Sequence, residues 1–305
     1  MDQAVALRAM KKSEQRSASA GGGGTYAVPG KEGMSRDNVR VISVTSGKGG
    51  VGKTNITVNL ACLLSKMKKK ILVLDADMGL ANIDVILGLT PKVNLFHVLN
   101  GEKSMKEAII RGPGGIMILP SASGIQEMSN LSKGQKLTLL DELRTVSREV
   151  DFLLIDTAAG IAGNVMYFNM AAHEIIVMAT PEPTSLTDAY AIIKILHQNH
   201  AKNCFRLLVN MVRDPQEGRE VYRRLNQATD RFLNLHIEYL GYIPRDEKLS
   251  DAVKQQKAFT TLYPDSPASK CLATLAEKLC HERMTGGDPG GISFFWERII
   301  EKDRG

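Results

Sequence analysis

The segment Gly47-Lys48-Gly49-Gly50-Val51-Gly52-Lys53-Thr54 decides the fold of this chain. Its four glycines let backbone N–H groups converge on phosphate oxygens, a lysine can reach the β- and γ-phosphates, and a threonine hydroxyl can hold Mg²⁺. The apolar run Val41–Val44 precedes the segment, and a helical pattern from Lys53 to Met67 follows it. A phosphate-binding loop requires this strand–loop–helix order, so we prefer it to a chance glycine-rich turn.

Outside this loop, β-branched apolar runs alternate with helical patterns. We expect strands at 39–45, 71–74, 116–119, 152–155, 175–179, 205–209 and 239–243, and helices at 53–67, 134–150, 184–198, 216–233 and 266–280. This order predicts an α/β fold, with a mostly parallel twisted sheet flanked by helices on both faces. Ligands of such sheets bind at the carboxyl ends of the strands.

Three aspartates are expected at that edge of the sheet. Asp75 and Asp77 follow the predicted strand 71–74, and Asp156 follows the strand 152–155. Carboxylates are ligands that Mg²⁺ prefers, and an aspartate near a γ-phosphate can orient or deprotonate the attacking water. Helix N-capping is the alternative role for one aspartate of each group, Asp75 in particular.

Lys48 is an additional cation at the start of the loop. It cannot reach the phosphates of its own nucleotide as easily as Lys53 does. A nucleotide held by a second subunit lies within its possible reach, where the ammonium would stabilise developing negative charge. The position of Lys48 therefore predicts a dimer that sandwiches nucleotide.

Three segments together resemble the MinD/ParA group of deviant Walker ATPases, a branch of the SIMIBI class of P-loop NTPases. They are residues 48–54, the run Asp75-Ala76-Asp77-Met78-Gly79-Leu80-Ala81-Asn82-Ile83-Asp84, and residues 156–160; the resemblance covers about 39–280. It implies ATP and Mg²⁺ as cofactors, ATP hydrolysis, and a face-to-face homodimer formed with ATP.

The resemblance also assigns roles to individual residues. It makes Lys48, Lys53 and Asp77 catalytic, with Lys48 acting in trans and Asp77 at the hydrolytic water, and it makes Asp156 the Walker B aspartate. Thr54, Asp77 and Asp156 are the implied metal ligands. The implied ATP-binding residues are Gly47, Lys48, Gly49, Gly50, Val51, Gly52, Lys53, Thr54, Asn55, Asp156, Asn210, Pro244 and Arg245. Asn55 departs from the serine or threonine that the family often has there.

The composition argues against several other classes. The 305 residues carry a net charge of +6, which we interpret as ordinary solubility, because no basic run alternates with aromatic residues. The basic run 66–70 is expected at a solvated helix end, and specific binding to nucleic acid is not expected. The four cysteines form no Cys-x-x-Cys pair, which argues against an iron–sulfur carrier. Without a signal peptide or a membrane-spanning run, we expect a cytoplasmic protein.

The N-terminal segment 1–16 has helical character, and a glycine-rich linker, 17–37, separates it from the expected ATPase domain, 38–283. Its sequence resembles the D-Q-A-x-x-L-R element in the flagellar branch of the family, which activates the SRP-type GTPase FlhF. By position, Asp2, Gln3, Ala4, Leu7 and Arg8 carry that element. The alternative is a frayed tail. The branch controls flagellum number and placement, so flagellar C-ring components are further implied partners.

The C-terminal segment 292–305 follows a second linker, 284–291. Ile292, Phe295, Trp296, Ile299 and Ile300 fall on one stripe of a helix. This pattern resembles a MinD-type membrane-targeting helix that binds the inner face of the cell membrane reversibly. A helix docked on its own domain is the alternative.

Other functions remain open within the same fold. A ParA-like partition ATPase would bind DNA through basic residues, and a bacterial tyrosine kinase would carry a terminal tyrosine cluster, whereas the last 60 residues contain Tyr263 alone. A switch with slow hydrolysis, whose output is partner binding, fits the two terminal segments best.

Overall fold

The computed structural model describes residues 39–77, 83–120, 141–142, 145–146, 148–200 and 202–282. All of them belong to Asp37–Gly305, the second of the two compact units into which the chain divides. The predicted α/β fold is confirmed: the described residues form an eight-stranded sheet in the order β3-β4-β2-β5-β1-β6-β7-β8. Every neighbouring pair is parallel except β3 with β4, which is antiparallel.

The strands are β1 (Arg40–Ser46), β2 (Ile71–Ala76), β3 (Ile110–Arg111), β4 (Met117–Pro120), β5 (Phe152–Ala159), β6 (Glu174–Ala179), β7 (Phe205–Val212) and β8 (Glu238–Pro244). The longer helices are α2 (Lys53–Lys66), α8 (Gly163–Ala171), α9 (Pro183–His200), α10 (Pro215–Leu233) and α13 (Pro267–His281). The short ones are α3 (Ile83–Leu87), α4 (Leu95–Leu99), α5 (Met105–Ala108), η1 (Pro113–Gly115), α11 (Lys248–Lys254) and α12 (Phe259–Leu262).

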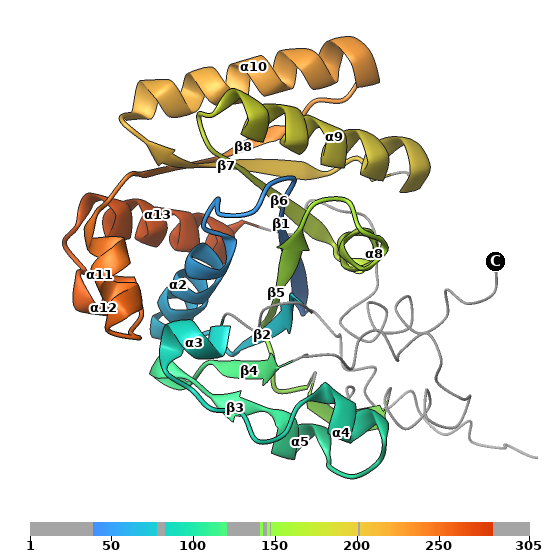
Figure 1. The fold of residues 1–305 in the computed structure, drawn as a ribbon, viewed down its shortest axis with the longest axis vertical. Helices are drawn as coiled ribbons and strands as arrows, with labels where there is room; N and C mark the ends of the chain where they lie inside the picture. Colours follow the sequence, from blue (N-terminus) through green and yellow to red (C-terminus); the bar gives the residue numbers. More distant parts are fainter. Residues whose placement is uncertain are drawn as a thin grey trace, which may run out of the picture. The chain divides into compact units, whose positions relative to one another are not determined.

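Helices cover both faces of the sheet, as Figure 1 shows. Alternate residues of β5 explain why: Leu154 packs into the core beneath α2 and α13, whereas Leu153 packs into the core of the opposite face. A third core lies between the sheet and the pair α9 and α10. Strands buried on both faces read as continuous apolar runs, which made them recognisable in the sequence.

The short elements were not expected from the sequence. Helices α3, α4, α5 and α12 have four or five residues each, too few to express a helical period. The nine-residue helix α8 was also missed, because it is apolar around most of its circumference and so shows no amphipathic stripe. Residues 141–142 and 145–146 are helical, inside the helix predicted at 134–150.

Candidate nucleotide-binding site

The phosphate-binding loop lies where β1 ends and α2 begins. Gly47 and Gly52 have to be glycine for different reasons. A Cβ at Gly47 would lie 2.3 Å from the backbone oxygen of Asp188 in α9. Gly52 is the N-cap of α2 and has φ 91°, in the left-handed region, and a Cβ there would lie 2.6 Å from Asn210 Nδ2. The loop is therefore held closely between α9 and the end of β7.

The two lysines of the loop occupy different environments. Lys53 is 8% exposed, and its Nζ donates to Ser46 Oγ at 2.8 Å. Lys48 points away from it toward the loop between β6 and α9, where its Nζ lies 2.6 Å from Glu182 Oε2 and 3.4 Å from Thr184 Oγ1. Burial lowers the pKa of the Lys53 ammonium, and the nearby carboxylates of Asp156 and Asp77 oppose that change.

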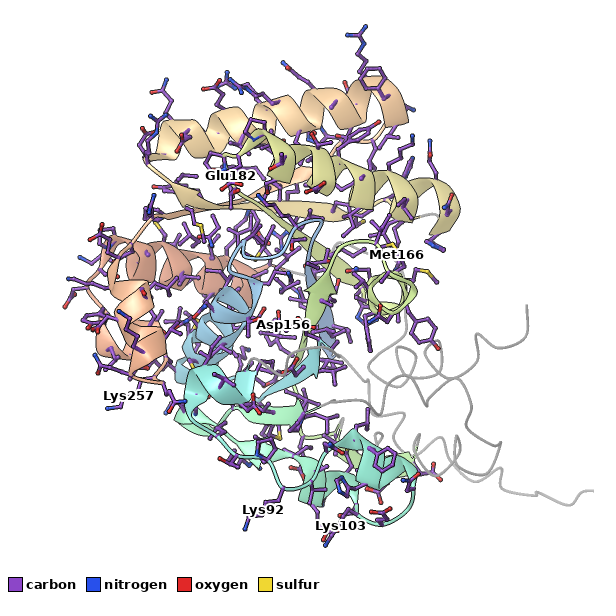
Figure 2. The ribbon with its side chains drawn as sticks, viewed as in Figure 1. Lys92, Lys103, Asp156, Met166, Glu182 and Lys257 are labelled. Carbon is purple, nitrogen blue, oxygen red and sulfur yellow. The ribbon has the colours of Figure 1, made fainter. Side chains whose placement is uncertain are left out.

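Asp75 and Asp156 face each other across neighbouring strands. They are register partners of β2 and β5, and both side chains lie on the α2 face of the sheet, in phase with Val73 and Leu154. Figure 2 places Asp156 in the interior of the domain. The sequence placed these aspartates after the strands; instead both lie within them, because the ladder continues to Ala76 and Ala159.

Burial raises the pKa of both carboxyl groups. It raises the pKa of Asp156 to about 7, although a hydrogen bond with the Thr54 side chain opposes the shift. It raises the pKa of Asp75 to about 6, even though Asp75 accepts from the backbone N–H groups of Asp77 and Ile83. Ile83 is the first residue of α3. By accepting from its backbone N–H, Asp75 makes a contact similar to the helix N-capping that was predicted as its alternative role.

The site suits a phosphate and a hydrated Mg²⁺. Asp156 Oδ2 is buried, and no residue in the described part of the chain hydrogen-bonds to it. Thr54 and Asp77 both lie close enough to Asp156 to influence its pKa. No group of three or more His, Cys, Asp or Glu among the described residues is placed to hold a metal. Mg²⁺ at phosphate sites keeps several of its waters and takes few protein ligands.

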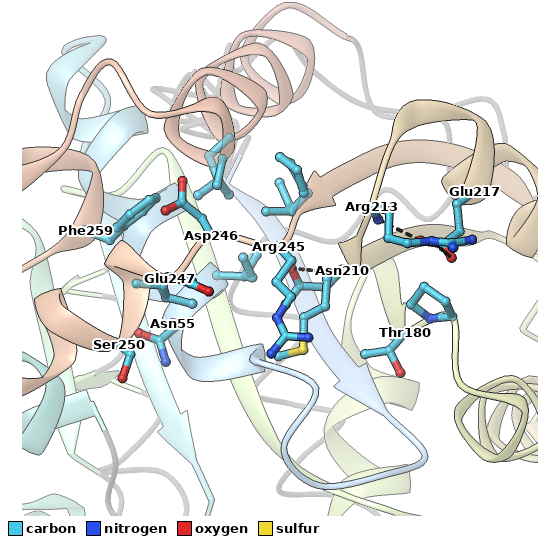
Figure 3. A pocket seen from close by; sticks show the side chains of 18 of the residues that line it. Asn55, Thr180, Asn210, Arg213, Glu217, Arg245, Asp246, Glu247, Ser250 and Phe259 are labelled. Atoms are coloured by element: carbon cyan, nitrogen blue, oxygen red, sulfur yellow. Dashed lines mark hydrogen bonds and ion pairs between the residues drawn. The ribbon is translucent and has the colours of Figure 1, made fainter.

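A pocket of about 750 Å³ adjoins the loop on the side of β7 and β8. It brings together four of the residues assigned to ATP binding by resemblance: Asn55, Asn210, Pro244 and Arg245. The resemblance assigns the last three of them to the adenine. Figure 3 shows Asn210 and Arg245 in the middle of the pocket, between Asn55 and Thr180. Asn210 also holds the loop, since its Nδ2 donates to the Val51 carbonyl at 2.8 Å.

Two contacts at this site were not anticipated from the sequence. Glu182, the partner of Lys48, follows β6 in the segment Pro181-Glu182-Pro183. Its position shortly after a strand, at the carboxyl edge of the sheet, could have identified Glu182 as a site residue. Ser46, the partner of Lys53, closes β1 and carried no signal of its own. The assigned residues of segments 1–16 and 292–305, and Met78–Asn82 of the family motif, lie outside the described residues.

This loop, its lysine and the buried carboxylates define a P-loop nucleotide-binding protein. A family model for the CobQ/CobB/MinD/ParA nucleotide binding domain matches residues 42–259. The chain therefore belongs to the CobQ/CobB/MinD/ParA family and is an ATPase, as the sequence predicted.

The relatives narrow the comparison to the flagellar branch of the family. The chain is 44% identical to the antiactivator FleN of Pseudomonas aeruginosa over 263 residues, covering 86% of this chain and 94% of FleN. It is 35% identical to the flagellum site-determining protein YlxH of Helicobacter pylori, covering 87% and 91% of the two chains. A solved MinC:MinD cell division complex from Aquifex aeolicus is similar with a TM-score of 0.64 and 28% identity, covering 82% and 99%. The predicted resemblance to the flagellar branch of the family is confirmed.

Proposed function

We propose that this chain is an ATP-dependent dimerising switch that controls flagellum number and placement. The observation that carries the proposal is that the two lysines of the loop occupy different environments. Lys53 is buried beside Asp156 and serves the phosphates of its own nucleotide, while Lys48 is directed away from it toward Glu182. Because the Lys48–Glu182 pair is about half exposed, with side-chain exposures of 42% and 63%, it is a weak surface pair that a second subunit can replace.

In this proposal the domain holds ATP and Mg²⁺ with residues from five segments. The loop 47–52 and Lys53 bind the phosphates, and Asn55, next to the loop, also binds ATP. Thr54, Asp77 and Asp156 would hold the metal, and Asn210, Pro244 and Arg245 bind the adenine. Mg²⁺, when bound, neutralises charge that develops on the phosphates. Asp77 orients the attacking water, and Lys48 stabilises the transition state in the partner subunit.

The two terminal segments give the switch its outputs. Residues Asp2–Arg8 stimulate the GTPase FlhF, with Gln3 positioning its attacking water, and Ile292–Ile300 bind the inner face of the cell membrane. One short helix binds a membrane weakly, whereas two helices on one dimer bind better through their effective concentration. ATP would thus control membrane attachment through dimerisation. Among the described helices, none is both long and apolar enough to cross a bilayer.

A lipid and DNA comparison tests the membrane output. The full chain is mixed with liposomes or with duplex DNA, each with ADP and then with ATP. The proposal predicts sedimentation with liposomes in ATP only, and Trp296→Glu should abolish it while ATP turnover persists. DNA binding without liposome binding would support the ParA-like alternative, which the flagellar names of the relatives do not favour.

The N-terminal output has its own test. Deleting residues 2–8 should leave ATP turnover intact and abolish the stimulation of GTP hydrolysis by purified FlhF. A matched control is Gln15→Ala, in the same predicted segment but outside the motif. If the deletion variant still stimulated GTP hydrolysis by FlhF to the same extent, residues 2–8 would not be the activating element.

A further inference from the structure

A basic hollow lies at the amino edge of the sheet, opposite the nucleotide site. Two adjoining cavities of about 280 and 290 Å³ share Arg111, Met117 and Glu149 as walls. The first is also lined by Lys68, Lys69 and Lys70, and the second by Lys106. We define this "basic hollow" by its five cations, Lys68, Lys69, Lys70, Lys106 and Arg111.

The hollow carries more cations than carboxylates, and the carboxylate at its edge, Asp151, accepts from the backbone N–H of Lys70 at 2.7 Å. Glu149 is the one carboxylate among the residues that line the two cavities. Within the part of the chain that the structure describes, no ion pair joins any of the five cations to a carboxylate. Four of the five are exposed, and Lys69 is half-buried. The hollow therefore offers four ammonium groups to an anion, together with the Arg111 guanidinium, whose Nη1 donates to the Gly115 carbonyl at 3.4 Å.

The backbone at Lys68 adds an independent observation. Lys68 has φ 65°, in the left-handed region, directly after the C-cap of α2. Glycine is the residue that adopts this helix-ending conformation without steric cost. A lysine there is unfavourable for the backbone, and its exposed charge offers a reason for its presence.

The hollow lies on the edge from which the chain runs toward its C-terminal segment. Asp151 joins the two places: its backbone oxygen accepts from Arg40 and its N–H donates to Lys70. Arg40 in turn donates to the carbonyl of Glu282, the last described residue, at 3.1 Å. From β1 to β4 the edge crosses three strand spacings, or about 14 Å. The nine residues 283–291 can span up to about 30 Å, which exceeds this distance. The linker is therefore long enough for Ile292 and the hollow to meet the same membrane surface.

The C-terminal segment itself lacks an electrostatic preference. From Glu297 to Arg304 it carries three acidic and three basic residues, so its attraction to anionic lipid is small. We infer that the basic hollow binds the headgroups of anionic phospholipids and supplies that preference. This inference rests on the proposed membrane attachment. The small size of the two cavities suits single headgroup phosphates better than the long charged track of a nucleic acid.

Matched charge variants of the full chain test the inference. Lys68→Gly, Lys69→Gln and Lys70→Gln together remove three charges from the hollow, and the first change also relieves the left-handed backbone. The control removes three exposed charges on α11, α13 and the turn after α11: Lys254→Gln, Lys257→Gln and Lys270→Gln. Binding is measured with ATP on vesicles of phosphatidylcholine alone, on vesicles of phosphatidylcholine with phosphatidylglycerol, and on duplex DNA. ATP turnover and the melting temperature establish that both variants fold.

The wild-type chain and the control variant should bind the anionic vesicles better than the neutral ones. The hollow variant should lose about 100-fold in affinity for anionic vesicles and little for neutral ones, because each of the three lysines near an anionic surface contributes about fivefold. Equal affinities of the two variants for anionic vesicles would overturn the inference while leaving membrane attachment intact. Binding to neither vesicle by the wild type would overturn membrane attachment itself. A loss confined to duplex-DNA binding would reassign the hollow to nucleic acid and also overturn the inference.

Discussion

The two edges of the parallel sheet bury charged residues in different ways. At the amino edge, Arg40 donates to both carboxylate oxygens of Glu174, one of them at 2.7 Å, and Arg206 donates to Glu174 at 3.3 Å. At the carboxyl edge, Asp75 and Asp156 lie side by side on adjacent strands. Lys53, the cation that interacts with Asp156, bonds to a hydroxyl group. The buried side chains at the amino edge pair with groups of opposite charge. The buried carboxyl groups at the carboxyl edge form no ion pair among the described residues and can still interact with a ligand.

This difference separates a structural cluster from a functional one. Arg40 also donates to the carbonyls of Leu279 and Glu282, so the amino edge ties the end of α13 to the first strand. Removing one partner of such a buried pair leaves an uncompensated charge and destabilises the fold. Buried carboxyl groups whose pKa is raised, beside a glycine-rich loop, are typical of a reactive site. The same sheet thus supports stability at one edge and chemistry at the other.

The largest expected effect is on turnover at the carboxyl edge. Asp77→Ala should lower the rate of ATP hydrolysis about 100- to 10,000-fold, because it removes the group proposed to orient the attacking water. ATP affinity should persist, since Lys53 and the loop are unchanged. Phosphate release and binding of a fluorescent ATP analogue measure the two quantities. Asp230→Ala, an exposed aspartate of α10, is the control. Normal turnover in Asp77→Ala would remove Asp77 from the chemistry.

The amino edge should respond in stability instead. Glu174→Ala leaves Arg40 and Arg206 buried without their shared carboxylate, which should cost about 3–5 kcal/mol in the free energy of unfolding. Glu220→Ala breaks an exposed pair with Arg224 and should cost less than about 1 kcal/mol. Denaturant titration measures both values. Similar losses in the free energy of unfolding for the two variants would show that the buried cluster at the amino edge matters no more to stability than an exposed ion pair.

The pH dependence of stability should come from the carboxyl edge. The raised pKa values of about 6 for Asp75 and about 7 for Asp156 mean that the folded protein favours their protonated forms. Their contribution to the free energy of unfolding is full below the pKa of an unfolded aspartate, about 3.9. It is lost as the pH rises through about 6 and 7.

Asp156→Asn should therefore flatten this decline by up to about 4 kcal/mol relative to the wild type between about pH 4 and pH 8. Denaturant titration at several pH values measures the difference. Mg²⁺ with ATP should flatten the decline of the wild type as well, because a bound cation favours the ionised carboxylate. Parallel curves for Asp156→Asn and the wild type would contradict the assignment.

A smaller effect is expected where the pocket meets the loop. Asn210→Ala removes the hydrogen bond to the Val51 carbonyl and leaves that buried group unsatisfied, at a cost of about 1–3 kcal/mol. ATP affinity should fall about tenfold, because the loop is less well held. Asn203→Ala, at an exposed position before β7, should change neither quantity. Isothermal titration calorimetry measures the ATP affinity of both variants. An unchanged affinity of Asn210→Ala would show that Asn210 does not contribute to nucleotide binding.

The sequence predicted the sheet and the loop because both depend on local patterns. Apolar runs such as 152–155 are recognisable without tertiary knowledge, and the spacing from Gly47 to Thr54 permits few other structures. It did not predict the contacts that close the site. Glu182 and Lys48 lie 134 residues apart in the sequence, and so do Arg40 and Glu174. Only the order of the strands in the sheet brings each pair together. Those pairings depend on sheet topology, which periodicity does not encode.

The most direct test of the switch is the mass of the particle in solution. The Asp77→Ala chain, which should retain ATP, is examined by light scattering with ADP and then with ATP and Mg²⁺. We predict a monomer of 33.4 kDa with ADP and a particle of about twice that mass with ATP, and adding Lys48→Ala should prevent the change. A monomer in both nucleotides would contradict the account, as would a dimer that forms equally well without Lys48.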